Sequence, residues 1–228
     1  MKKSFYFLLI AAVFSLGSLC AYGAEATAQA IVLKIKGSAN VVFAGQTQPI
    51  AIKVGDKLPQ GATITTSPNS EVDVQAFNGA VATIKADSTV NLEKLSVTTS
   101  GGAVTKQTAL LNLKVGSILS NIDPANHNIN DYGIRTPKGV AAARGTVFFV
   151  HVSENGQVQV FVTQSAIMFH PLGGGKPVEI PAGYSFSVNP DGTLGVVTQV
   201  TDANPAPEGA TTIPAIDPGE QVIVSPMR

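Results

Sequence analysis

The side chains that could do chemistry in this sequence are few and widely spaced. One arginine, Arg144, stands between a run of small residues and an apolar run at residues 147–152. The three histidines are separate: His127 lies in a polar stretch, and His151 and His170 each end an apolar stretch. This spacing fits neither a zinc site nor the regular acidic ligands of a calcium loop. We therefore expect no metal and no cofactor.

A hydrolase is the one class of enzyme that these residues could still support. It would need His151, His170 and Asp131 to converge in a single cleft. The sequence has no Gly-x-Ser-x-Gly elbow and no His-Glu-x-x-His motif. Glu71 and Asp73 form a carboxylate pair of the kind that glycosidases use, but the chain has no tryptophan to hold a sugar. We expect a protein that is not an enzyme and keep a hydrolase as the last alternative.

Arg144 is interpreted as a structural residue. Burying a lone cation is costly unless it is paired or multiply hydrogen-bonded. Alanines on one side and phenylalanines on the other predict a buried guanidinium that bonds backbone carbonyls or a carboxylate. Replacement by alanine should then lower the melting temperature markedly. The alternative is a guanidinium that binds a ligand or a partner. Gly139 and Gly145 are interpreted as residues that the backbone geometry requires.

Short strands separated by turns must position these residues. Apolar and polar residues alternate at 31–35, 71–77 and 89–95, with Ile31, Leu33 and Ile35 expected on one buried face. Turn signals recur about every 8–12 residues, which indicates a single antiparallel β-sandwich or β-roll; a short β-helical stack is the alternative. Residues 98–107 are polar and glycine-rich and predict a loop or a mobile hairpin. The predicted turns include Gly55, Asp56, Asn78, Gly79, Asn155, Gly156 and Gly183.

The N-terminus has the pattern of a secretory signal peptide, assigned to residues 1–26. Two lysines precede an apolar run at residues 5–14, which is too short to span a bilayer. Small residues then allow cleavage near Gly23 to Ala26. The one cysteine, Cys20, follows Gly-Ser-Leu, which does not fit a lipoprotein acceptor site. We expect a periplasmic or secreted protein without a lipid anchor.

The mature chain divides into a β domain at residues 27–202 and a proline-rich, mostly disordered tail at 203–228. An apolar patch at residues 222–224 could dock on a sheet edge or on a partner. Cleavage after Gly23 removes Lys2 and Lys3, so the 15 basic residues fall to 13, against 15 acidic ones. There is no basic patch and no later apolar run of membrane-spanning length, so neither nucleic acid nor a transmembrane helix is expected. The sequence leaves the oligomeric state open.

The sequence from Thr136 onward resembles the signature segment of FecR-like domains. The residues that carry this resemblance are Thr136, Pro137, Gly139, Arg144, Gly145, Thr146 and Phe148. Earlier motifs fit the same family in the same order: residues 54–58, 61–64 and 67–70, followed later by Ala182 and Gly183. The resemblance covers residues 31–188.

The resemblance implies a domain that senses or relays a signal outside the cytoplasmic membrane through contacts with another envelope protein. Some members of the family carry a cytoplasmic segment that controls a sigma factor. This sequence shows no such segment and no membrane helix, so we expect a stand-alone binding or assembly module. A peptidoglycan or polysaccharide-binding module is the alternative, and it would need an exposed aromatic face around Tyr132 or Tyr184.

Overall fold

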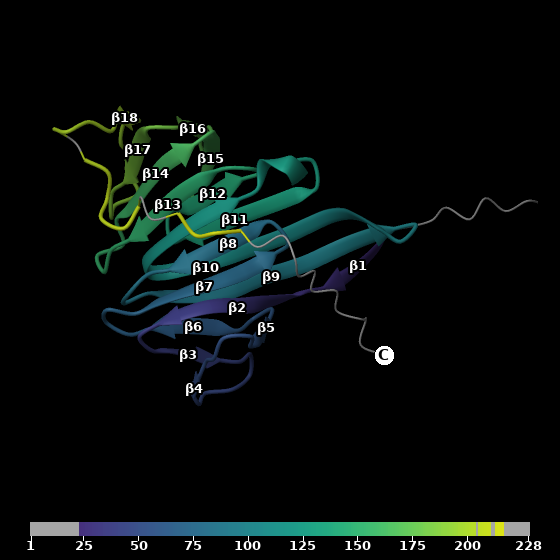
Figure 1. The fold of residues 1–228 in the computed structure, drawn as a ribbon. Coiled ribbons are helices and arrows are strands. Elements are labelled where there is room, and N and C mark those ends of the chain that lie inside the picture. The colour runs from purple at the N-terminus through teal and green to yellow at the C-terminus, as the bar shows by residue number, and fades with distance from the viewer. Residues whose placement is uncertain (1–22, 204, 211–212, 217–228) are drawn as a thin grey trace, which may run out of the picture.

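The computed structural model describes residues 23–203, 205–210 and 213–216. Within these ranges the chain is almost entirely β-structure, and its only helical element is a short 3-10 turn, η1 (Pro124–Asn126). The strands form one open, mixed sheet that folds across into two layers, sheet A and sheet B (Figure 1). The predicted all-β fold of many short strands is confirmed, except that one strand pair is parallel and the sheet is therefore mixed. Most of the predicted signal peptide lies outside the described residues.

Sheet A has the strand order β4–β3–β6–β9–β10–β11–β12–β15–β16, and β1 pairs beside the far end of β9. All of these pairs are antiparallel except β10–β11, which is parallel. The strand bounds are β1 (Ala24–Thr27), β3 (Ala39–Val42), β4 (Ile50–Ala51), β6 (Thr63–Thr66), β9 (Thr89–Ser100), β10 (Ala103–Ile122), β11 (Asn130–Thr136), β12 (Gly139–Ala143), β15 (Ala166–Pro171) and β16 (Val178–Pro181).

Sheet B has the order β5–β2–β7–β8–β10–β13–β14–β17–β18, with every pair antiparallel. Its remaining strands are β2 (Gln29–Lys36), β5 (Lys57–Pro59), β7 (Glu71–Phe77), β8 (Ala80–Ile84), β13 (Val147–Val152), β14 (Val158–Gln164), β17 (Tyr184–Val188) and β18 (Thr198–Gln199).

Strand β10 belongs to both layers. It pairs with β9 as far as Val115, with β13 from Gly116 onward and with β8 from Ile118 onward. Gly116 has φ +96°, a conformation that side chains disfavour, so a glycine makes this bend possible. The chain crosses between the layers in the neighbouring segments as well. Strand β12 pairs with β15 in sheet A, and β13 pairs with β14 in sheet B. The outer faces of sheets A and B are therefore opposite surfaces of the molecule.

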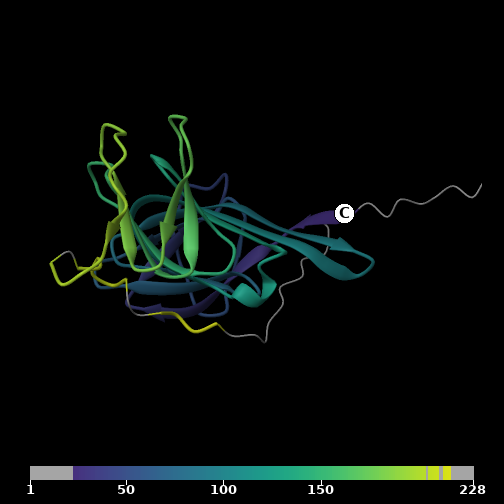
Figure 2. The same ribbon diagram turned by 90° about the horizontal axis from the view of Figure 1, so that it is seen from above.

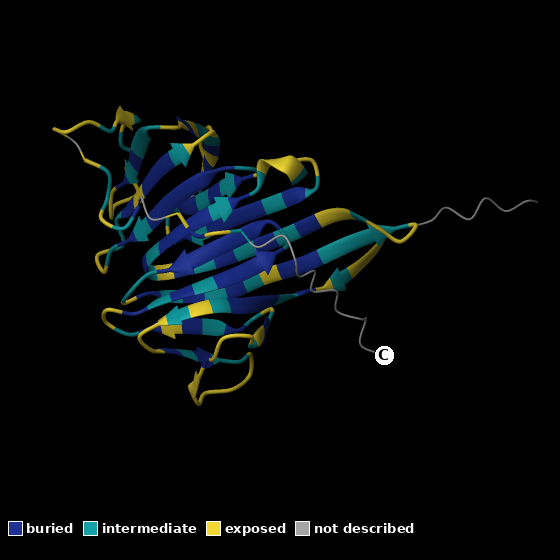
Figure 3. Ribbon diagram, viewed as in Figure 1, coloured by how far each residue is buried: buried dark blue, intermediate teal, exposed yellow. Residues whose placement is uncertain are grey.

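The core lies between the two layers (Figure 3). On β7, Val72, Val74 and Ala76 alternate into it, as the sequence pattern predicts. The prediction for β2 was right for Ile35, which packs against the core, and wrong for the residues before it: Ala30 and Val32 face the core, Ile31 is buried outside the core cluster and Leu33 is half-buried. The physical reason is a register shift between β2 and β7 at Val32. One added residue in the pairing moves the following side chains to the other face.

Two predicted hairpin turns are present, at Asn78–Gly79 between β7 and β8 and at Asn155–Gly156 between β13 and β14. Both glycines have positive φ, +86° and +82°. Residues 98–107 form the end of the long β9–β10 hairpin, which turns at Gly101–Gly102 and projects from the body of the fold (Figure 2). Of the two interpretations of this stretch, the hairpin is the correct one.

The described part of the C-terminal tail lies against the outer face of sheet B. Residues 205–210 and 213–216 run across the strands of this layer without joining the ladder (Figure 1). Ala210 is fully buried there. The apolar patch at residues 222–224 lies outside the described residues. No helix in the described ranges is long and apolar enough to cross a membrane.

Candidate functional site

The segment from Thr136 to His151 carries the chain from sheet A, through β12, to β13 in sheet B. The Thr136 hydroxyl donates to the Gly139 carbonyl at 2.9 Å and accepts from the Gly139 N–H at 3.1 Å, which closes the turn that contains Pro137. A Cβ on Gly139 would lie 2.6 Å from the His170 carbonyl oxygen on β15. Gly139 thus lets β12 and β15 pack closely, and its φ is outside the left-handed region.

The other end of the segment is fixed by similarly close contacts. A Cβ on Gly145 would lie 2.6 Å from the Pro124 Cα of η1. The Thr146 hydroxyl donates to the Gln164 carbonyl, and Phe148 packs edge-on against the Tyr132 ring at 6.2 Å between centroids. These contacts fix β12 in one layer and β13 in the other. They therefore also fix the position of the residue between the two strands, Arg144.

The prediction that Arg144 is buried was wrong. Its side chain is exposed, and within the described residues it makes no hydrogen bond or ion pair. The physical reason is its place at the crossing from β12 to β13, where the chain has left sheet A and has not yet entered sheet B. Ala141, Ala143, Phe148 and Phe149 are buried within their own strands, and Arg144 between them remains on the surface.

Arg144 lies at a depression on the outer face of sheet A, which we call the sheet A hollow. Its volume is about 510 Å³. Residues of β11, β12, β15 and β16 line it together with Arg144, and Ala142 contributes only a small side chain. The residues that define it are Asp131, Ala142, Arg144, Met168, His170 and Glu179.

The charges around the sheet A hollow are mixed. Asp131 is paired with Lys106 at 2.8 Å, whereas Arg144 has no such partner. Met168 is 36% exposed, which adds an apolar wall. The arrangement suits recognition of a segment that combines an apolar side chain with a carboxylate.

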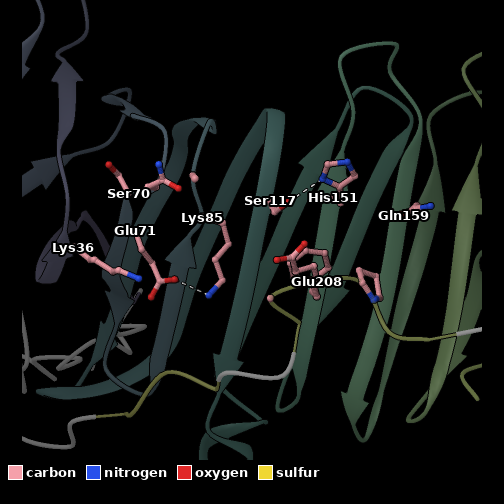
Figure 4. Close-up of a pocket in the computed structure, with 13 residues that line it drawn as sticks. Lys36, Ser70, Glu71, Lys85, Ser117, His151, Gln159 and Glu208 are labelled. Carbon is pink, nitrogen blue, oxygen red and sulfur yellow. Dashed lines mark hydrogen bonds and ion pairs between the residues drawn. The ribbon is translucent and has the colours of Figure 1, made fainter. Parts of the chain in front are cut away.

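A second depression lies on the outer face of sheet B and is called here the sheet B groove. Its volume is about 680 Å³, and the tail residues 207–209 form one wall. A row of polar side chains crosses its strands (Figure 4). The row consists of Lys36, Glu71, Lys85, Ser117, His151 and Gln159.

Two contacts order this polar row. Lys85 donates to Glu71 at 2.9 Å, and the Ser117 hydroxyl shares a 2.9 Å hydrogen bond with His151 Nδ1 (Figure 4). Burial lowers the pKa of His151, and a hydrogen bond to the Gly116 backbone opposes that shift. A neutral imidazole is therefore favoured in the folded state. Sequence reasoning missed this pair because it depends on the register of β10 against β13, which sets Ser117 opposite His151.

The predicted hydrolase constellation is contradicted by these positions. His170 and Asp131 are in the sheet A hollow, whereas His151 is in the sheet B groove on the opposite surface. His127 lies beside η1, with its Nδ1 3.0 Å from the Pro124 carbonyl. Ser117 and His151 lack a carboxylate that orients the imidazole among the described residues, and nucleophilic catalysis relies on such a third group.

The described residues contain no group of three or more His, Cys, Asp or Glu side chains arranged to hold a metal ion. The aromatic face needed for polysaccharide binding is also not where it was expected. Tyr132 is 1% exposed and Tyr184 is half-buried against the core. Tyr132 fails as a sugar platform because its ring packs between Phe77 and Phe148.

The predicted turn residues occupy turns in the structure. Asp56 accepts a hydrogen bond from the Lys53 N–H at 2.7 Å, which closes the turn containing Gly55. Asn155 accepts from the Gln157 N–H at 3.1 Å in the β13–β14 hairpin. Gly55 and Gly183 have positive φ, +87° and +81°.

Residues 62–168 match the model of the FecR protein family. No match is found among curated proteins. Two crystal structures of a candidate anti-sigma factor from Parabacteroides distasonis ATCC 8503, at 2.50 Å and 1.65 Å resolution, are partly similar to this chain. Each is 14% identical with a TM-score of 0.48, and the match covers 60% of this chain and 59% of the other. The chain thus spans about three fifths of the length of these structures.

Proposed function

We propose that this chain, which contains a FecR-like domain at residues 62–168, is a non-enzymatic module of envelope signalling or assembly that acts through contacts with another envelope protein. Its place of action is outside the cytoplasmic membrane, in the periplasm or beyond. The family match supports a regulatory role, and the mixed charges of the two depressions support binding more than they support catalysis.

The observation that carries the proposal is the exposure of Arg144 at the rim of the sheet A hollow. The close contacts of Gly139 and Gly145 fix the backbone on both sides of it, so the guanidinium is presented from a rigid base. Arginine is enriched in protein interfaces because it combines a flat apolar surface with five hydrogen-bond donors. Arg144 is therefore assigned as a recognition residue.

The partner surface should match the hollow. A carboxylate would meet Arg144, and an apolar side chain would fit over Ala142 beside Met168. A bidentate arginine–carboxylate contact fixes direction as well as affinity.

A site-specific photo-crosslinker at Met168, carried by the full-length protein in its native envelope, tests the proposal. We expect a discrete adduct with another envelope protein at Met168 and none at Lys53, an exposed position beside β4 at the far end of sheet A. Adding Arg144→Glu should abolish the adduct while the melting temperature stays unchanged. An adduct of equal yield in that variant would refute the role given to Arg144.

A further inference from the structure

The outer face of sheet B carries an apolar row that is separate from the core. Leu119 on β10 lies opposite Phe149 on β13, and Phe149 lies opposite Phe161 on β14. These side chains form a second hydrophobic cluster together with Val147 and the tail residue Ala210. Two phenylalanines on the outward face of a sheet would be solvent-exposed without a cover. Residues 205–210 and 213–216 of the same chain form the cover here and are called the strap.

The strap is held by few contacts. Ala210 is fully buried over the cluster, and the Asn121 side-chain amide donates to the Pro214 carbonyl at 2.8 Å. The turn at Ala210 is closed by its own bond to the Pro207 carbonyl, and no ladder joins the strap to sheet B in the described residues. Side-chain burial and one hydrogen bond therefore supply most of the contact between the strap and sheet B. A segment bound in this way can be exchanged for a peptide from another chain.

The strap also shows which chemistry the surface accepts. Ala206 and Ala210 pack on the cluster, and Pro207 lines the sheet B groove together with Phe149. The one acidic side chain of the strap, Glu208, lies in the same groove with Lys36, Lys85 and His151 (Figure 4). Proline-rich segments lose little conformational entropy on binding, and aromatic surfaces are the usual place where they dock.

We propose that the outer face of sheet B is a peptide-binding surface, occupied in cis by the strap and taken in trans by a segment of another protein that is rich in proline and small apolar residues, with an acidic residue among them. Because the strap is tethered to the surface, it competes with a free peptide at an effective concentration of the order of millimolar. A free peptide therefore binds weakly while the strap is in place. Binding of the partner then requires the strap to be displaced. The surface is opposite the sheet A hollow, so this proposal does not depend on the role of Arg144.

The experiment uses the full chain and a fluorescently labelled synthetic peptide with the sequence of residues 205–216. Ala210→Asp places a charge against Phe149 and Phe161 and should release the strap without touching the core between the layers. We expect the variant to bind the peptide, by fluorescence anisotropy, at least about tenfold more tightly than the wild type, whose surface is blocked. The matched control is Ala215→Asp, an exposed position in the same strap, which should behave like the wild type.

A scrambled peptide separates sequence-specific docking from general stickiness and should not bind. Asn121→Leu, which removes the bond to Pro214, is a second way to release the strap and should raise peptide binding in the same direction. The proposal is overturned if neither variant binds the peptide more tightly than the wild type, or if the scrambled peptide binds equally well.

Discussion

Gly116 and Ser88 approach each other so closely that a Cβ on Gly116 would lie 2.5 Å from the Ser88 Cα. The contact is where β10 bends from sheet A into sheet B. The Ser88 hydroxyl accepts from the Ser117 N–H at 2.9 Å and donates to the Ala86 carbonyl at 3.1 Å. One serine thus ties the bend of β10 to the crossing between β8 and β9, and the fold-over of the sheet depends on that pair.

Gly116→Ala should therefore be strongly destabilising. A side chain at φ +96° costs about 1–2 kcal/mol, and the clash with the Ser88 backbone adds about 1–3 kcal/mol. The free energy of unfolding, measured by urea denaturation, should fall by about 3 kcal/mol. Gly102→Ala is the matched control, because Gly102 has φ +82° but nothing within 4 Å of its Cβ position. Equal losses in the two variants would contradict the steric part of the argument.

Arg144→Ala should leave stability unchanged within about 0.5 kcal/mol, because the side chain is exposed and forms no ion pair in the described residues. This reverses the expectation from the sequence. Arg135→Ala is the comparison: Arg135 Nε bonds Glu93 at 2.9 Å at a partly buried position, so its loss should cost about 0.5–1 kcal/mol. Thermal melts of the two variants side by side decide the matter, and a large loss for Arg144→Ala alone would restore a structural role.

Ser120 and Tyr132 form a buried hydroxyl pair at 2.9 Å. Burial raises the pKa of Tyr132, and the bond to Ser120 opposes that shift only in part. Ser120→Ala strands the phenol and should cost about 1–3 kcal/mol, and Tyr132→Phe strands the serine hydroxyl in the same way. The double variant should lose clearly less than the two single losses added together. Urea denaturation of all four proteins gives the coupling energy, and strict additivity would show that the hydroxyls do not depend on each other.

Much of the fold follows from local patterns. Alternation at residues 71–77 and the Asn-Gly turns are set by neighbours in sequence, and both were predicted. The fold-over of the sheet was not, because it depends on the close approach of Gly116 to Ser88, which are distant in the chain. The core-facing residues at the start of β2 were mispredicted for a similar reason. The register shift after Val32 arises from the pairing with β7, and the sequence of β2 alone does not indicate it.

The candidate sites show the same limit. The motif around Arg144 could be recognised from residue types and spacing, but whether its guanidinium is buried depends on where the chain crosses between layers. The Ser117–His151 pair and the cover over Phe149 arise from strand register and from the path of the tail. The proline-rich composition of that tail is visible in the sequence, whereas its contact with Phe149 depends on the path of the folded chain.

His151 should make the stability of the protein pH-dependent. Burial lowers its pKa in the folded state, so the unfolded chain binds the proton more readily. The stability that the neutral imidazole contributes is complete above the unfolded pKa of about 6.5 and is lost as the pH falls toward the folded pKa. Between about pH 7.5 and pH 5, the free energy of unfolding should therefore fall more steeply for the wild type than for His151→Gln. Urea denaturation at each pH measures the slopes, and parallel curves for the wild type and His151→Gln would show that the imidazole titrates alike in both states.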